Sequence, residues 1–243
     1  MKAIVLAAGY ATRLYPLTLD RPKALLEVGG RPMLDRVLER VLAIGGVDEA
    51  IVVTNAKFAP QFEEWAAGKG HVRVLDDGTT SEEDRLGAIG DIGFVLDRVG
   101  LEGDVVVVAG DNLFGSDISD FGRAARERQA PLLAVREVGD LGEMSKYNQV
   151  QTDDDGRVTF FEEKPARATT TLMGVALYFY PRQALPLVRQ YLAEGNNPDQ
   201  PGRLVEWLYP RTPVYTWRVP GDWYDIGSAE TLEHANAVFS ASE

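Results

Sequence analysis

The 243-residue chain contains no cysteine and only two histidines, His71 and His234. Without cysteine there is no disulfide, thiolate nucleophile or cysteine-ligated zinc, and two isolated histidines do not form a histidine metal site. Basic residues are also few, because 25 Lys and Arg stand against 37 Asp and Glu and leave a net charge of −12. A negative chain is a poor partner for nucleic acid or an anionic membrane surface. The sequence therefore predicts neither nucleic acid nor a membrane surface as a partner.

The N-terminus lacks a long apolar run, since MKAIVLAA at residues 1–8 gives way to polar residues by Arg13. This run suits a β-strand and is too short for a transmembrane helix. We find no targeting segment and expect a cytoplasmic protein. Hydrophobic residues make up 45% of the chain and charged residues 26%, as in an ordinary globular protein.

Apolar runs of strand length alternate with stretches of helical period in the first half of the chain. This alternation predicts an α/β fold in which βα units surround a mostly parallel sheet. The four valines at 105–108 predict a central strand that is buried on both faces. The other expected strands are residues 2–7, 50–54 and 72–75, and the expected helices are 34–44, 58–67, 86–99 and 117–128.

The second half has shorter strands and predicts a smaller antiparallel subregion. The sequence DDDG at 153–156 is typical of a hairpin turn. Because no repeat or linker is visible, we expect one domain over residues 1–243. The expected strands are 132–136, 149–152, 158–161, 172–180 and 214–218, the helices 181–192, 204–209 and 228–239, and the loop 194–202.

A loop rich in small residues and positive charge follows the first strand. Residues 9–24 carry Arg13, Arg21 and Lys23 against Asp20, a local charge of +2 in a negative chain. Backbone N–H groups in such a loop approach a ligand closely and bind phosphate. The loop therefore predicts an anion site, although a plain βα turn with solvated cations is the alternative. Its sequence is neither a P-loop nor a dinucleotide fingerprint.

Acidic residues follow two later segments. Asp111 comes directly after the valine strand, at the end of the sheet where open α/β folds bind ligands. Asp225 lies in WYDIGS at 223–228, with Asp222 as a nearby alternative. Two carboxylates together with phosphate and water oxygens suit Mg²⁺. The competing interpretation makes both aspartates solvated surface acids.

These segments together resemble the sugar-phosphate nucleotidyltransferases, the family of glucose-1-phosphate thymidylyltransferase and related NDP-sugar pyrophosphorylases. The resemblance rests on LAAGYATRL at 6–14 with PKALL at 22–26, GDN at 110–112, EKP at 163–165 and the segment around Asp225. It covers about residues 1–239 and implies a Rossmann-like three-layer sandwich. Residues 1–130 would mainly bind nucleotide and residues 131–243 mainly the acceptor.

The resemblance also implies the site residues. The nucleotide site would comprise Leu6, Ala7, Ala8, Gly9, Thr12, Arg13, Arg85, Gly87 and Asp111. The acceptor site would comprise Asn148, Glu163, Lys164, Val175 and Ala176. Arg13, Lys23 and Lys164 would be catalytic, and Asp111 and Asp225 would hold the cofactor Mg²⁺. The implied reaction joins dTTP, UTP or CTP to a sugar 1-phosphate or a similar phosphorylated acceptor and releases pyrophosphate.

The chain departs from the family where base and sugar are recognised. Asn148 follows Tyr147 where the family has glycine, and GVALY at 174–178 lacks the family's Thr-Gly pair. No glutamine that reads thymine is visible at 81–87, where Arg85 is either a base or phosphate contact or a surface residue. A cytidylyltransferase for a phosphorylated polyol, choline or phosphonate thus stays open.

A non-catalytic nucleotide-binding regulator also remains an alternative, although such a protein has no need of both metal carboxylates. A glycosyltransferase is disfavoured because Asp111 starts no Asp-x-Asp pair. Without hexapeptide repeats we expect a catalytic domain and no fused acetyltransferase. A homo-oligomer is left open.

Overall fold

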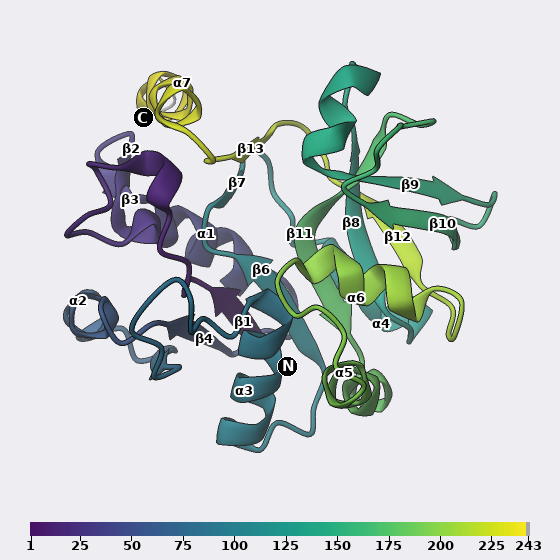
Figure 1. Ribbon diagram of the computed structural model, residues 1–243, viewed down its shortest axis with the longest axis horizontal. Coiled ribbons are helices and arrows are strands. Elements are labelled where there is room, and N and C mark those ends of the chain that lie inside the picture. The colour runs from purple at the N-terminus through teal and green to yellow at the C-terminus, as the bar shows by residue number, and fades with distance from the viewer. Residues whose placement is uncertain (242–243) are drawn as a thin grey trace.

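A seven-stranded sheet forms the centre of the computed structural model, which describes residues 1–241 apart from the side chain of Glu143 (Figure 1). Its strands, in spatial order, are β12 (Tyr215–Arg218), β8 (Leu132–Glu137), β11 (Leu172–Tyr180), β6 (Val105–Ala109), β1 (Lys2–Leu6), β4 (Glu49–Thr54) and β5 (Val72–Asp76). Strands β6, β1, β4 and β5 run parallel, whereas β11 is antiparallel to both β6 and β8. This sheet confirms the predicted α/β fold.

Helices cover both faces of the sheet (Figure 1). One face packs against α1 (Met33–Leu42), α2 (Ala59–Ala66) and α4 (Phe121–Arg128), and the other against α3 (Ala88–Val99), α5 (Leu185–Ala193) and α6 (Pro201–Leu208). Val106 and Val108 of β6 face the first group, whereas Val105 and Val107 face the second. The four valines are at most 1% exposed, as expected for a strand buried on both faces.

Smaller antiparallel units complete the fold. The predicted hairpin forms between β9 (Asn148–Thr152) and β10 (Val158–Glu163), and Gly156 adopts a φ of 77° in its turn. The remaining short strands are β2 (Glu27–Val28), β3 (Arg31–Pro32), β7 (Asn112–Phe114) and β13 (Trp223–Asp225). Strands β7 and β13 pair antiparallel and were not predicted.

The last helix, α7 (Ala229–Ser240), begins after the predicted cap Ser228, whose hydroxyl accepts the N–H of Thr231, and packs against β2 and β13. Short 3₁₀ helices are η1 (Thr12–Leu14), η2 (Lys23–Leu25), η3 (Leu141–Lys146) and η4 (Arg182–Ala184). Within residues 1–241, no helix combines the length and the apolar character that crossing a membrane requires.

Several predicted boundaries were wrong. The helix expected from residue 181 begins as the 3₁₀ helix η4 and becomes α-helical only at Leu185. The helix expected from residue 117 begins at Phe121, because the carboxylate of Asp117 accepts the N–H and hydroxyl of Ser119 and forms a turn instead. The loop expected over 194–202 ends at Gln200, because Pro201 occupies the first position of α6, where its missing N–H costs nothing.

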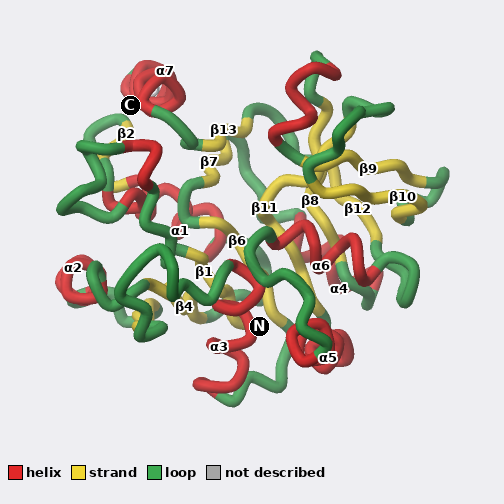
Figure 2. Tube along the Cα trace, in the orientation of Figure 1, coloured by secondary structure: helices red, strands yellow, loops and turns green. Residues whose placement is uncertain are grey.

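The loop that joins α5 to α6 packs on the first turn of α3 (Figure 2). The N–H of Ala88 donates to the carbonyl of Asp199 (3.3 Å) and the N–H of Ile89 to that of Pro198 (2.8 Å). These carbonyls satisfy two N–H groups that the start of a helix leaves unpaired. Gly87 allows the close approach, because its φ is 78° and a Cβ there would lie 2.7 Å from the carbonyl oxygen of Pro198.

We expect Gly87→Ala to lower the free energy of unfolding by about 3 kcal/mol, measured by urea denaturation. The backbone of Gly87, with φ 78° and ψ 162°, lies in a region that only glycine adopts readily and costs alanine about 1–3 kcal/mol, and overpacking against fixed backbone adds roughly 1–3 kcal/mol. Gly100 is the control for a positive φ without the clash, because it is in the left-handed region (φ 65°, ψ 42°) and no atom lies within 4 Å of an added Cβ. Gly100→Ala should cost only about 1 kcal/mol. Equal losses in the two variants would contradict this account of the packing.

Candidate active site

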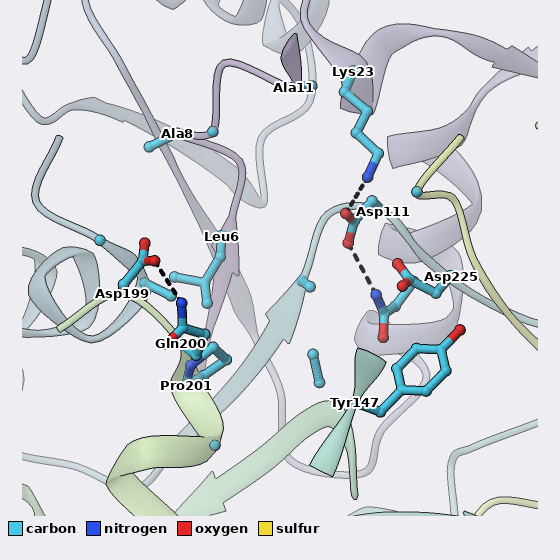
Figure 3. A pocket seen from close by; sticks show the side chains of 18 of the residues that line it. Leu6, Ala8, Ala11, Lys23, Asp111, Tyr147, Asp199, Gln200, Pro201 and Asp225 are labelled. Atoms are coloured by element: carbon cyan, nitrogen blue, oxygen red, sulfur yellow. Dashed lines mark hydrogen bonds and ion pairs between the residues drawn. The ribbon is translucent and has the colours of Figure 1, made fainter. Parts of the chain in front are cut away.

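A cavity of about 580 Å³ opens at the carboxyl ends of β1 and β6 and is lined from both halves of the chain (Figure 3). The predicted site residues that line it are Leu6, Ala8, Gly9, Thr12, Arg13, Lys23, Arg85, Gly87, Asp111, Asn148, Glu163, Lys164, Val175, Ala176 and Asp225. Ala7 is not among the lining residues. Its N–H is bound to the carbonyl of Val53, and its methyl group lies beside Gly110.

The loop after β1 presents its backbone to this cavity. Ala11 has a φ of 51°, in the left-handed region, and its carbonyl accepts the hydroxyl of Thr18 at 2.8 Å. The N–H groups of Gly9, Tyr10 and Ala11 have no acceptor within the described part of the chain. Successive N–H groups of this kind bind anions. The geometry therefore fits the anion site that the sequence predicts.

A chain of polar contacts fixes Asp111 across the cavity (Figure 3). The ammonium of Lys23, on η2, lies 2.5 Å from one carboxylate oxygen of Asp111. The other oxygen accepts the side-chain N–H of Asn112 at 2.9 Å, and the amide oxygen of Asn112 accepts the indole N–H of Trp223 at 3.0 Å. These contacts leave Asp111 little freedom to rotate.

Asp225 reaches the same place through the β7–β13 ribbon. Asp225 pairs with Asn112, and the N–H of Ile226 donates to the carbonyl of Asp111 at 3.2 Å. Burial and then the carboxylate of Asp111 raise the pKa of Asp225 to about 6, while Lys23 and Arg13 oppose the shift.

Two neighbouring carboxylates are hard oxygen donors that a divalent cation such as Mg²⁺ favours. Three or more Asp, Glu or His side chains do not converge on one point anywhere in residues 1–241. A metal held by Asp111 and Asp225 would therefore complete its shell with oxygens from substrate and water, as Mg²⁺ commonly does. The donor set fits the predicted metal.

The other side of the cavity holds Glu163 and Lys164, at the end of β10. Lys164 has a φ of 53°, and its N–H donates to the carbonyl of Tyr147 at 2.8 Å. Burial raises the pKa of Glu163 to about 7 although Lys164 and Arg203 lower it. The carboxylate of Glu163 lies against Gly202 of α6, where a Cβ would have no room. A glycine at this point is thus needed to seat Glu163.

Asn148 uses its side chain to hold β11. Its amide donates to the carbonyl of Gly174 (3.1 Å) and accepts the N–H of Gly174 (2.6 Å). These bonds lie where the pairing of β11 with β8 shifts register between Gly174 and Tyr178. The side chain of Asn148 thus shapes the cavity wall next to Val175 and Ala176, with its amide already engaged.

Arg85 also has its partners within the protein. Its guanidinium pairs with Glu82 and lies 3.0 Å from the carboxylate of Asp199. Arg85 therefore joins the loop before α3 to the loop before α6.

The sequence analysis did not single out several residues that line the cavity. Asp91 could have been noticed in the sequence, because it is an acid within the buried apolar stripe of α3. Gln200, Pro201 and Gly202 left none, since only the packing of α6 brings them to the cavity. The other residues missed include Tyr10, Asp77, Glu82, Tyr147 and Asp199.

Comparison with known proteins gives a consistent picture. The sequence pattern of the nucleotidyl transferase family matches residues 2–241. Glucose-1-phosphate thymidylyltransferase of Streptomyces antibioticus is 28% identical over 238 residues, which cover 97% of this chain and 65% of that protein. Mannose-1-phosphate guanylyltransferase of Mycobacterium tuberculosis is 33% identical over 192 residues, 77% of this chain and 51% of that protein.

UTP–glucose-1-phosphate uridylyltransferase AglF of Haloferax volcanii is 29% identical over 180 residues, 74% of this chain and 72% of that protein. The chain thus spans between 51 and 72% of the length of these curated relatives. The structure of a UDP-glucose pyrophosphorylase complexed with UDP-glucose superposes with a TM-score of 0.82 at 20% identity and covers 100% of this chain and 99% of that one. The fold is therefore shared, and the chain belongs to the nucleotidyl transferase family.

Proposed function

We propose that this protein transfers a nucleotidyl group from a nucleoside triphosphate to a sugar 1-phosphate, with Mg²⁺ as cofactor, and yields an NDP-sugar and pyrophosphate. The observation that carries the proposal is the convergence on one cavity of an unpaired backbone N–H loop, Arg13, Lys23, Lys164 and two carboxylates. Family membership and the names of the relatives support the same reaction. We retain the cytoplasm as the expected location.

This reaction requires that the two substrates be positioned and that the negative charge of their phosphates be offset. An oxygen of the acceptor phosphate attacks the α-phosphorus, a new phosphorus–oxygen bond forms, and the bond to the bridging oxygen breaks as pyrophosphate leaves with the electron pair. The nucleophile is already an anion and requires no general base. This explains how a chain without cysteine and with two histidines supports the reaction.

We assign each charged group a role that agrees with its place in the cavity. The N–H groups of residues 9–11 and the guanidinium of Arg13 bind the β- and γ-phosphates. Lys23 offsets charge at the α-phosphate, and Lys164 binds the acceptor phosphate. Glu163 accepts hydrogen bonds from acceptor hydroxyls.

Asp111 and Asp225 would hold Mg²⁺, which when bound supplies positive charge beside the phosphates. The carboxylate of Asp111 is fixed by Lys23 and Asn112. Its neighbour Asp225 has a raised pKa because it is buried next to this second carboxylate. Bound cations relieve such repulsion between carboxylates, because an opposite charge favours the ionised form.

The reaction is tested by pyrophosphate release from the purified chain. Five nucleoside triphosphates are combined with sugar 1-phosphates, inositol phosphate and phosphocholine, in Mg²⁺ or in EDTA. We expect release only when both substrates and the metal are present. Nucleotide binding without release across the panel would show a regulatory protein and refute the transfer reaction.

We expect Asp111→Asn and Lys23→Ala each to lower turnover by roughly a hundredfold or more, because each removes one charge partner of the transition state. Steady-state pyrophosphate release and circular dichroism together separate lost catalysis from lost folding. Asp222→Asn is the matched control, because Asp222 is near Asp225 in sequence but its side chain is 70% exposed and outside the cavity. Near-normal turnover of Asp111→Asn would remove Asp111 from the reaction.

The raised pKa of Glu163 predicts a pH dependence of acceptor binding. Only the carboxylate form accepts two hydrogen bonds, and its population rises as pH passes upward through about 7. The acceptor KM should therefore fall by up to roughly tenfold between pH 6 and pH 8. In Glu163→Gln the contribution of Glu163 to the pH dependence of KM is absent. Only the titration of the acceptor phosphate, whose second pKa is about 6, then remains. An identical KM profile in wild type and variant would exclude Glu163 as the titrating group.

A further inference from the structure

Two fully buried polar side chains support the loop after β1 from within the core. Thr18 and Asn55 are both 0% exposed and are not among the residues that line the cavity. The hydroxyl of Thr18 donates to the carbonyl of Ala11 at 2.8 Å. The side-chain amide of Asn55 donates to the carbonyl of Ala8, also at 2.8 Å. Ala8 and Ala11 themselves line the cavity (Figure 3).

Each of these hydrogen bonds fixes the direction of the next N–H group along the chain. A trans peptide is planar, and its C=O and N–H point in opposite directions. The peptides that follow the two carbonyls are trans. Because the carbonyls are held toward the core, the N–H groups of Gly9 and Thr12 are turned away from it. Gly9 and Thr12 line the cavity, and neither N–H has an acceptor within residues 1–241.

The backbone of Ala11 needs this support because it is strained. Its φ of 51° and ψ of 43° lie in the left-handed region, which is unfavourable for a residue with a Cβ. Its carbonyl accepts a second bond, from the N–H of Leu14 at 3.0 Å, where η1 begins. A strained conformation persists only where several contacts hold it, and such residues cluster at ligand-binding sites.

The two supports come from different parts of the fold. Asn55 follows β4 directly, and its amide oxygen accepts the N–H of Phe58 at 3.2 Å, just before α2 begins. Thr18 lies between η1 and η2, in the segment that leads to Lys23. The loop is therefore fixed to β4 on one side and to the segment before Lys23 on the other.

We propose that Thr18 and Asn55 are positioning residues for the triphosphate, which hold the loop after β1 so that its N–H groups face the phosphates before a nucleotide binds. The inference rests on the phosphate-binding role that the proposed function gives this loop, and it adds two residues that touch neither substrate. Donors that are already oriented bind more tightly, because less conformational freedom is lost on binding.

Calorimetric binding of inorganic triphosphate in Mg²⁺ tests the proposal without turnover. Thr18→Val removes the hydroxyl donor and nearly keeps the shape, and the carbonyl of Ala11 retains the N–H of Leu14. We expect the triphosphate affinity of this variant to fall about tenfold, because an N–H that binds a charged ligand loses its fixed direction. Thr18→Ser keeps the donor and should bind triphosphate within about threefold of wild type.

Thr54→Val is the matched control. Thr54 is also 0% exposed and precedes Asn55, but its hydroxyl has no hydrogen-bond partner within the described chain. This variant therefore loses the same buried hydroxyl without releasing a carbonyl of the loop. Its affinity for triphosphate should equal that of wild type.

Asn55→Leu tests the second support. The N–H of Phe58 keeps a bond to the backbone carbonyl of residue 55 at 3.2 Å, whereas the carbonyl of Ala8 loses its side-chain donor. We expect a loss of triphosphate affinity of about tenfold here too. Circular dichroism is measured on each variant to confirm that it is folded.

Steady-state kinetics separates positioning from a general loss of structure. The nucleotide KM of Thr18→Val should rise about tenfold, because the loop binds the phosphates of the nucleotide. The acceptor KM should stay within about twofold of wild type, because Lys164 and Glu163 lie on another wall of the cavity. Equal rises in both KM values would indicate a merely structural role.

The outcomes separate this proposal from nucleotidyl transfer. Unchanged triphosphate affinity in Thr18→Val, equal losses in Thr18→Val and Thr54→Val, or a wild-type chain that binds no triphosphate overturns the positioning role and leaves the transfer reaction standing. Triphosphate affinity that depends on Thr18, without pyrophosphate release on the acceptor panel, supports the positioning role and overturns the transfer reaction.

Discussion

The contact between β1 and β6 determines where the cavity forms. The two strands run parallel with Leu6 opposite Ala109, and the N–H of Gly110 donates to the carbonyl of Leu6 at 2.9 Å. A Cβ on residue 110 would lie 3.1 Å from that oxygen, so glycine keeps the strand ends together. The loop after β1 and Asp111 after β6 consequently leave the sheet side by side. Chemistry at the carboxyl edge of the sheet depends on this one close approach.

Charge is distributed very unevenly in this protein. The chain is strongly negative, yet Arg13 and Lys23 gather with Asp111 and Asp225 in one place. Burial raises the pKa of Asp225, the carboxylate of Asp111 adds to the rise, and Lys23 and Arg13 oppose it. A negative surface with a local cationic loop directs polyanionic ligands to the loop and away from other faces.

Local periodicity predicted most of the fold, because a strand or helix that buries one face repeats its apolar residues at a fixed spacing. The strands β7 and β13 could not be found this way. Each is three residues long, and they pair across more than a hundred positions of sequence. The same limit applies to the start of α6, where composition indicated a loop and only a proline marked the first turn.

The candidate site likewise contains residues that the sequence locates and residues that only the structure reveals. Motif residues such as Lys23, Asp111 and Lys164 were located from sequence because their neighbours along the chain form recognisable strings, and the structure gathers them in one cavity. Asn148 was expected to meet the acceptor, but its amide is bound to Gly174, a contact that depends on the register of two strands. Asp91 needed tertiary context, since only the facing Asp77 shows what its buried carboxyl meets.

The loop between α5 and α6 connects two walls of the cavity. Asp199 is bound to the first turn of α3, and three residues later Gly202 supports Glu163 on the opposite wall. Because this connection is short, it ties the first turn of α3 to the wall that holds Glu163. A shift of the first turn of α3 would therefore also move the wall around Glu163, because Asp199 and Gly202 belong to one short segment.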